Sequence, residues 1–308
     1  MASTLQGAVA APGRATTGSR SGVWLTELLL LTMALIWGVN YSVAKYATGQ
    51  FAPLAFNGVR VALAAVALLL VAAVTSRAPW PSRGETLKLL GLGVLGNCVY
   101  QVFFIEGVAR TGAGTAALIL AAAPAVIALM GRFHGVERVS RRVAGGIALS
   151  IAGVALVMFG GGQRVADASL LGNLLMFAGC VSWAAFTVLL TPYTERVPGL
   201  QLSAITMAGG AIPLLAAAAP SLAATRWSAV SPGAWGAVAY GSVAALVIAY
   251  VIWYRGVRVI GPTRTAMFGN LQPFIALAAA WFAFGDVPSA LQLFGAAGIT
   301  GGILLTRA

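Results

Sequence analysis

The stretch GVARTGAGTAALILAAAP at residues 107–124 returns as GVRVIGPTRTAMFGNLQP at residues 256–273. One offset of 149 residues aligns the two without a gap, and the same register extends over residues 97–157, which recur within 244–306. It places Pro124 on Pro273 and, further along, Glu137 on Asp286. Composition bias could match some glycines, but it would not keep prolines and acids in one register. The chain is therefore predicted to hold two copies of one unit, a construction typical of transporters.

The composition indicates that lipid is the main solvent of this chain. Of the 308 residues, 59% are hydrophobic and 8% are charged, against roughly 25% charged in a typical soluble domain. The formal net charge of +12 raises the question of nucleic acid, but the 19 Lys and Arg residues lie mostly in short loops between apolar runs. No basic helix face of the nucleic-acid-binding kind is present, so we expect no nucleic-acid partner.

Ten apolar segments predict an all-α membrane protein. Each is about as long as the twenty or so residues that cross a bilayer core, and a crossing segment must be helical because lipid offers the backbone no hydrogen-bond partner. The expected helices are residues 25–46, 53–74, 88–107, 112–130, 143–160, 169–190, 201–219, 234–254, 261–283 and 289–306.

The helices divide into two repeats of five that follow a tail. Residues 1–22 are expected to form a disordered cytoplasmic tail, residues 23–160 the first repeat and residues 161–308 the second. Thirteen Lys and Arg residues fall on the tail's side of the membrane and four on the other, which predicts that both the N- and the C-terminus face the cytoplasm. Because five is odd, the repeats are inverted, and the site is expected between them around a central cavity near the bilayer midplane.

Polar and aromatic side chains recur at helical spacing in the middle of several predicted helices. In the first, Trp37, Asn40 and Tyr41 follow Met33 at i+4, i+7 and i+8, which places all four on one face. Ordinary helix packing and interhelical hydrogen bonding are the alternative role for such residues. The predicted substrate-binding set is Met33, Trp37, Asn40, Tyr41, Asn97, Tyr100, Gln101, Phe104, Trp183, Phe186, Tyr250, Trp253, Phe268 and Gln272.

The chemistry of this set favours a neutral or zwitterionic solute. No Asp or Glu lies in the middle of a predicted helix, whereas an exporter of lipophilic cations normally needs an intramembrane acid. Aromatic faces would hold an apolar side chain, and the four amides would bind polar ends. Glu27 and Glu106, at helix ends, are weak candidates for proton carriers, so proton exchange and downhill facilitation both stay open.

Three further features of the predicted helices concern charge, bending and packing. Arg60 lies about 10 Å inside the second helix at 1.5 Å per residue; it either attracts an anionic group or extends outward to the headgroups. Pro124 and Pro273 lie inside the fourth and ninth helices, where their kinks are either gate hinges or static bends. The fifth and tenth helices are rich in small residues, including the GxxxG pair Gly298 and Gly302, and are expected to pack together.

A set of motifs extends over nearly the whole chain beyond the tail. They are Trp37-Gly38-Val39-Asn40, Pro53 with Arg60, Gly107, Pro124 followed by Glu137, Pro273 and Asp286. In this combination the chain resembles the drug/metabolite transporter superfamily, and within it the EamA-type ten-helix exporters. It looks most like those members that export aromatic and other apolar amino acids. The resemblance implies a basket-like fold with a central cavity, and export by alternating access.

The expected function is therefore export of small neutral amino acids, mainly aromatic and apolar. An exporter of another metabolite or drug on the same fold is the closest alternative, and a passive pore is a second. We expect no enzyme, because the only histidine, His134, lies in a loop and no nucleophile–base pair is evident. Cys98 and Cys180 are expected to be core residues, since no metal-ligand spacing is present. No cofactor is expected, and the transporter is expected to be monomeric.

Overall fold

The computed structural model describes residues 20–133, 141–159, 167–260, 265 and 268–307, and within these ranges the chain is helical with no strand. Residues 1–19 of the expected tail therefore lie outside the described part, as do His134, Glu137 and Arg264. The principal elements are α1 (Arg20–Thr48), α2 (Pro53–Thr75), α3 (Arg83–Val94), η1 (Leu95–Val99), α4 (Tyr100–Arg110), α5 (Ala113–Leu120), α6 (Ala123–Phe133), α7 (Arg141–Phe159), α8 (Asp167–Thr194), α9 (Gly199–Ala224), η2 (Trp227–Ala229), α10 (Pro232–Ala239), η3 (Tyr240–Ile248), α11 (Ala249–Ile260), α13 (Gln272–Phe284) and α14 (Ala290–Arg307).

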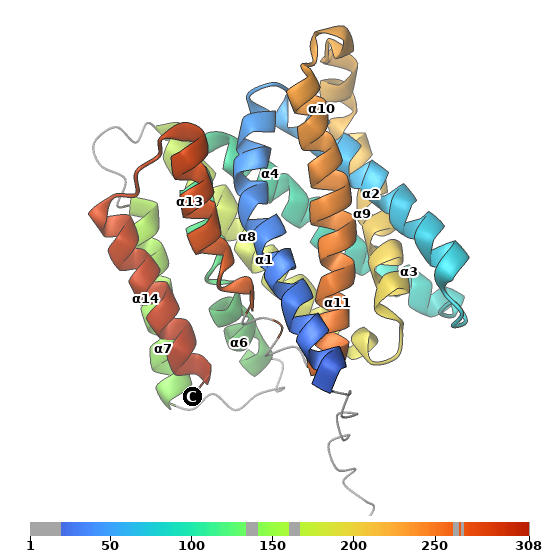
Figure 1. The fold of residues 1–308 in the computed structure, drawn as a ribbon, viewed down its shortest axis with the longest axis horizontal. Coiled ribbons are helices and arrows are strands. Elements are labelled where there is room, and N and C mark those ends of the chain that lie inside the picture. Colours follow the sequence, from blue (N-terminus) through green and yellow to red (C-terminus); the bar gives the residue numbers. More distant parts are fainter. Residues whose placement is uncertain (1–19, 134–140, 160–166, 261–264, 266–267, 308) are drawn as a thin grey trace, which may run out of the picture.

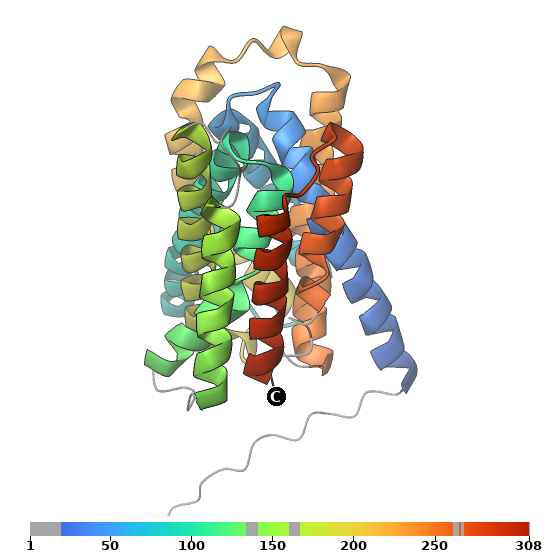
Figure 2. The same ribbon diagram turned by 90° about the vertical axis from the view of Figure 1, so that its left-hand side faces the viewer.

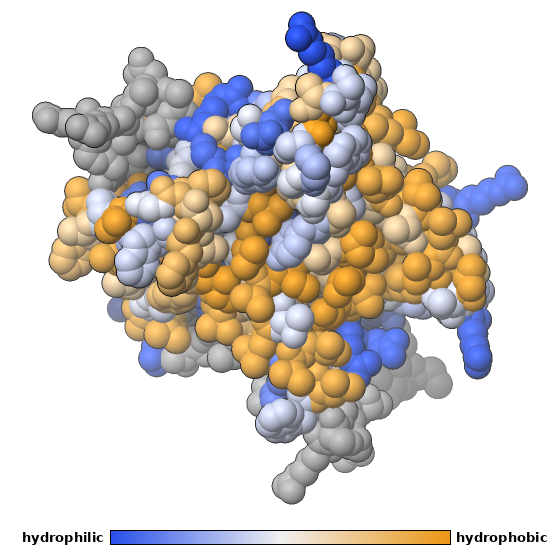
Figure 3. All heavy atoms as spheres, turned by 45° about the horizontal axis from the view of Figure 1, so that its top comes forward, coloured by the Kyte–Doolittle hydropathy of each residue, from blue (hydrophilic) through white to orange (hydrophobic). Residues whose placement is uncertain are grey.

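Helix lengths and surface character fit a membrane protein. In the described part of the chain, six helices are long and apolar enough to span a bilayer, and 113–127, 144–157 and 272–284 are shorter apolar helices. Large hydrophobic side chains are exposed along the bundle; Val74 and Phe282, for example, are each 85% accessible. Figure 3 shows apolar side chains over much of the flank and hydrophilic ones gathered toward the ends. Such a surface is stable against lipid but not against water.

In Figure 1 the helix α1 lies between two groups of helices, and in Figure 2 it runs along one edge of the bundle. It contacts α11 and η3 of the second half of the chain and α4 and α5 of the first. On one side of it lie α13, α14 and α7, and on the other α2 packs along α9, which also contacts α3. The start of α1 and the end of α14 lie at the same end of the bundle.

The small residues of α7 and α14 let these two helices approach closely, as the sequence predicts. A methyl group added to Gly153 would lie 2.6 Å from the carbonyl oxygen of Gly295, and one added to Gly295 would lie 2.7 Å from the carbonyl oxygen of Gly153. Gly302 similarly touches the carbonyl of Gly146. The two helices therefore run antiparallel. Under the offset of 149, the Gly153–Gly295 and Gly146–Gly302 contacts exchange with each other.

Two helices contain a π-helical turn at matching positions. The segment Leu95–Val99 joins α3 to α4, and its equivalent under the same offset, residues 244–248, lies in the π segment that joins α10 to α11. The backbone N–H of Tyr100 bonds to the carbonyl of Leu95, and that of Ala249 bonds to the carbonyl of Ala244. A π turn leaves part of the helical hydrogen-bond ladder open and is frequently found at functional sites.

The structure divides the predicted fourth and ninth helices next to Pro124 and Pro273, where the sequence predicts kinks. The fourth expected helix is divided into α5 and α6 at residues 121–122, and Pro124 is the second residue of α6. Pro273 is likewise the second residue of α13, just after a turn. Proline lacks the N–H that a helix interior needs, but the first turn of a helix leaves that donor unused, so the chain begins a new helix there.

Candidate functional site

Eight of the predicted aromatic residues form one continuous network of ring contacts. They come from α1, α4, α8 and α11, two from each helix. We call this set the aromatic network: Trp37, Tyr41, Tyr100, Phe104, Trp183, Phe186, Tyr250 and Trp253. Each helix contributes its pair at a spacing of three or four residues, so both rings lie on one face of the helix.

The network runs from the first half of the chain into the second through Trp183. Its ring centroid lies 5.1 Å from that of Tyr100 and 6.3 Å from that of Tyr250. Beyond Tyr100, the rings of Phe104 and Tyr41 continue the series at 5.9 and 5.7 Å. These distances fall within the range of favourable tilted and edge-to-face pairs. The rings therefore form a mutually packed aromatic cluster that joins the two halves of the chain.

Trp37 connects the other end of the network to the π turn. Its ring lies 5.8 Å from Tyr250 in an edge-to-face arrangement and 5.7 Å from Trp253. Its indole Nε1 donates to the carbonyl oxygen of Ala245, within η3, at 2.9 Å. Because η3 is irregular, the carbonyl oxygen of Ala245 can accept a hydrogen bond from a side chain of α1. A tryptophan with this bond is fixed in position, unlike one held by packing alone.

Two predicted amides are buried with unused hydrogen-bonding groups. Asn97 is fully buried in the π turn, and neither atom of its amide has a partner within the described residues. The carbonyl oxygen of the Asn40 side chain is buried and likewise without a partner there. An unpaired buried amide costs free energy, so such groups in a native fold need an explanation. A polar solute bound at these amides would be such an explanation.

Gln101 is also buried, but its side-chain oxygen has a hydrogen-bond partner. Its Oε1 accepts a hydrogen bond from Nη2 of Arg60 at 2.6 Å, and its backbone carbonyl accepts one from Nδ2 of Asn57 at 2.8 Å. Asn57 and Arg60 are absent from the predicted binding set. The sequence signal that could have identified them is their spacing of three residues, because it places both side chains on one face of the helix.

The remaining predicted residues lie at the margin of this arrangement. Met33 is fully buried and packs with Phe268 and Leu30 in a separate small apolar cluster that touches Trp37. The backbone carbonyl of Gln272 faces Gly38 on α1, where an added methyl group would lie 3.1 Å away. Met33 and Phe268 therefore belong to the same apolar cluster, but no ring contact joins Phe268 to the aromatic network among the described residues.

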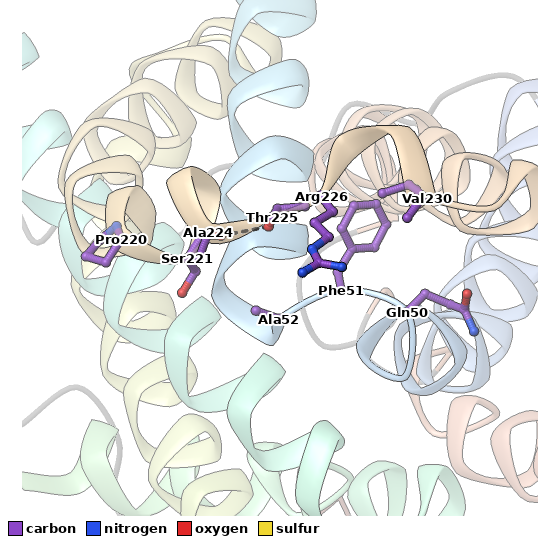
Figure 4. Close-up of a pocket in the computed structure, with 10 residues that line it drawn as sticks. Gln50, Phe51, Ala52, Pro220, Ser221, Ala224, Thr225, Arg226 and Val230 are labelled. Atoms are coloured by element: carbon purple, nitrogen blue, oxygen red, sulfur yellow. Dashed lines mark hydrogen bonds between the residues drawn. The ribbon is translucent and has the colours of Figure 1, made fainter.

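A separate cavity of about 470 Å³ lies where the α1–α2 connection meets the end of α9 (Figure 4). Gln50, Phe51 and Ala52 line one side, and residues from Pro220 to Val230 line the other, among them Arg226. Figure 4 shows Arg226 beside Phe51. Sequence reasoning did not find this cavity, since none of its lining residues lies in the middle of a helix.

Comparison with known proteins gives a consistent family. The EamA-like transporter family matches residues 24–159 and again residues 170–308. Uncharacterized transporter YyaM of Bacillus subtilis is 27% identical over 90% of this chain and 92% of its own. A probable terminal-alkyne amino-acid exporter of Streptantibioticus cattleyicolor is 26% identical over 92% and 93%, and a probable amino-acid metabolite efflux pump of Salmonella typhimurium 27% over 90% and 93%.

The fold is also shared with a solved crystal structure. The two superpose with a TM-score of 0.63 at 20% sequence identity, over 92% of this chain and 96% of the other. Family matches in both halves of the sequence and a shared fold over most of its length lead to one conclusion. This chain is a membrane transporter that belongs to the EamA-like transporter family of the drug/metabolite transporter superfamily.

Proposed function

We propose that this protein exports small neutral amino acids, mainly aromatic and apolar ones, from the cytoplasm. The observation that carries the proposal is the aromatic network, which collects eight rings from four helices, together with the unpaired buried amide groups of Asn40 and Asn97. Ring faces and edges hold apolar and aromatic side chains, while the unused amide groups offer hydrogen bonds to an ammonium or a carboxylate.

The names of two relatives support the same substrate class. One is a probable terminal-alkyne amino-acid exporter and the other a probable amino-acid metabolite efflux pump, and each aligns with at least 90% of this chain. At 26% and 27% identity these proteins can differ in the side chain they prefer. The composition of the aromatic network is therefore the basis for proposing large apolar substrates for this chain.

The proposed mechanism is alternating access by two inverted five-helix repeats. Contacts that exchange under the repeat offset support it, as do the matched π turns of η1 and η3. Gly107 touches Met176 of α8, and its equivalent under the offset, Gly256, touches Leu30 of α1. Each repeat thus packs against the first helix of the other repeat. A rocking motion of one repeat against the other would therefore move both sides of the proposed site together.

We place the protein, as a monomer, in a bacterial inner membrane with both termini in the cytoplasm. The charge asymmetry of the loops supports this orientation, and the two ends of the described chain lie at one end of the bundle. Single cysteines at Arg141 and Ala290 should react with a membrane-impermeant maleimide from opposite sides of the membrane, because α7 and α14 run antiparallel. Labelling of both from the same side would contradict the inverted arrangement.

The substrate is tested by efflux from proteoliposomes loaded with radiolabelled phenylalanine, tryptophan, leucine or a cationic dye. We expect the three amino acids to leave and the dye to remain. Runs with and without a pH gradient distinguish proton exchange from downhill facilitation. Trp183→Ala should lower phenylalanine efflux by about tenfold or more, because it removes the ring that joins the two ends of the network.

The matched control is Trp24→Ala, which removes a tryptophan that is 71% exposed near the start of α1. Its efflux should equal that of the unmodified protein. Dye efflux without amino-acid efflux would show that the proposed substrate class is wrong. Equal losses in both tryptophan variants would show that the network is not the site.

A further inference from the structure

Arg60 is the most deeply buried charge in the described part of the chain. It lies in α2, seven residues after Pro53 and therefore roughly 10 Å along the helix, and its side chain is 1% exposed. A long side chain at this depth could reach the headgroups, but a residue so fully covered does not. Of the two interpretations that the sequence leaves open, extension to the membrane surface is therefore wrong.

Within the described part of the chain, the residues that contact the guanidinium are neutral. Nη2 donates to Oδ1 of Asn57 at 2.8 Å and to Oε1 of Gln101 at 2.6 Å. The central carbon Cζ lies 5.6 Å from the ring centroid of Phe56 and 5.7 Å from that of Phe104. Nε is buried and has no hydrogen-bond partner within the described residues. Amide oxygens and ring faces offset part of the cost of burying this charge, but they leave its net charge in place.

A counter-ion from the protein is missing in the described residues. The ion pair found among these residues joins Arg110 to Glu106 within α4, whereas Arg60 belongs to α2. An unpaired charge inside a membrane protein is expensive and is kept where it has a function. The described part of the fold thus contains a positive site that an anion would complete.

The fold makes room for this arginine and keeps it in one place. A methyl group added to Gly241, in η3, would lie 2.5 Å from Cδ of Arg60, so any larger residue there would displace the side chain. Asn57 is fully buried, and it connects the arginine to the backbone of α4 through its bond to Gln101. Two helices of the first half and the π turn of the second therefore position the guanidinium.

Phe104 links this position to the proposed site. Its ring lies beside the guanidinium and also contacts the rings of Tyr41 and Tyr100 in the aromatic network. A molecule with a carboxylate at one end and an apolar group at the other could contact both. Gln101, already bonded to Arg60, lies one turn before Phe104 in α4.

We propose that Arg60 is the subsite for the carboxylate of the transported molecule. This proposal rests on the proposed function and narrows it: the substrates are α-amino acids and other apolar carboxylic acids, and the corresponding amines and amides are excluded. A guanidinium presents several N–H donors in a planar fork that matches a carboxylate, and such charge-assisted bonds are among the strongest in proteins. The side chain of the substrate extends from there onto the aromatic network.

The test compares phenylalanine with phenylalaninamide, which has the same ring and amino group but no carboxylate. Competition with labelled phenylalanine in proteoliposomes, and the ligand-induced rise in melting temperature of the purified protein, give two independent measures. The unmodified protein should prefer phenylalanine by about tenfold or more, the size expected for a charge-assisted hydrogen bond. In Arg60→Met the preference should fall to about one.

The variants separate this role from a structural one. Arg60→Lys retains the charge without the fork and should keep part of the preference, whereas Gly241→Ala leaves the arginine in the sequence and should reduce the preference by displacing it. Arg77→Gln removes an exposed arginine and should change nothing. If Arg60→Met is not recovered in folded form, Arg60→Lys and Gly241→Ala supply the same comparison.

The outcomes also distinguish the subsite from the proposed function. A folded Arg60→Met protein that still prefers phenylalanine over its amide would overturn the subsite. If no amino acid is transported but 3-phenylpropionate binds in an Arg60-dependent way, the subsite stands and the proposed amino-acid substrate is wrong. Binding of neither compound by the unmodified protein would reject both.

Discussion

The hydroxyl of Ser150 in α7 donates to the carbonyl oxygen of Ile299 in α14 at 3.3 Å, and these two residues are equivalent under the repeat offset of 149. Residues that contact their own equivalents are expected where a twofold axis passes between two copies. The exchanging glycine contacts lie on either side of this pair. Because the two helices run antiparallel, such an axis would lie across them, in the plane of the membrane.

Close packing along this axis leads to a prediction about stability. Gly153→Val should lower the melting temperature of the purified protein, because the added side chain would collide with the carbonyl of Gly295. Overpacking of this kind costs about 1–3 kcal/mol. Gly145→Val is the matched control, since nothing lies within 4 Å of a methyl group at that position. Equal melting temperatures for the two variants would contradict the contact.

The bond between Trp37 and the π turn predicts a difference between Trp37 and Trp183, the tryptophans that α1 and α8 contribute to the aromatic network. Trp37→Phe keeps a ring but loses the hydrogen bond to the carbonyl of Ala245, a loss of about 0.5–1.5 kcal/mol, so efflux should fall by roughly two- to tenfold. Trp183→Phe loses no hydrogen bond found among the described residues and should have a smaller effect. A larger effect at Trp183 would indicate that ring size, and not the bond to η3, governs transport.

The unpaired amide of Asn97 predicts that stability and transport will separate. Asn97→Leu should leave the melting temperature unchanged or raise it, because the amide has no partner among the described residues to lose. Amino-acid efflux should nevertheless fall by about tenfold, the loss expected for a hydrogen bond to a charged group.

Asn173 provides the matched comparison for Asn97. Its side-chain oxygen accepts a hydrogen bond from Thr111 at 2.7 Å, so Asn173→Leu should destabilise the protein by about 1–3 kcal/mol. A destabilised Asn97→Leu protein with normal efflux would show that Asn97 is a packing residue.

The helix breaks at Pro124 and Pro273 give a prediction about gating. If the half-helices move around these positions, replacing both prolines with Ala should stabilise continuous helices and slow efflux several-fold, with little change in substrate affinity. Pro220→Ala in α9 is the control, because this proline lies inside an uninterrupted helix. Unchanged efflux in the double variant would establish the breaks as static.

The sequence by itself determined the helical class, the family and most of the aromatic network. Apolar runs can be recognised without a structure because lipid requires helices, and spacings of three and four residues place rings such as Trp37 and Tyr41 on one face. The packing of the fifth and tenth helices followed for a similar reason, since rows of small residues identify a close interface.

Only the tertiary structure decided what depends on contacts between distant segments. The break before Pro124 follows from competition between local backbone geometry and packing, which a hydrophobic pattern does not record. The role of Arg60 depended on whether its side chain points toward lipid or into the bundle, and neighbours from α4 and η3 determine that. Periodicity identifies the face on which a residue lies, but its partners are fixed only when the helices assemble.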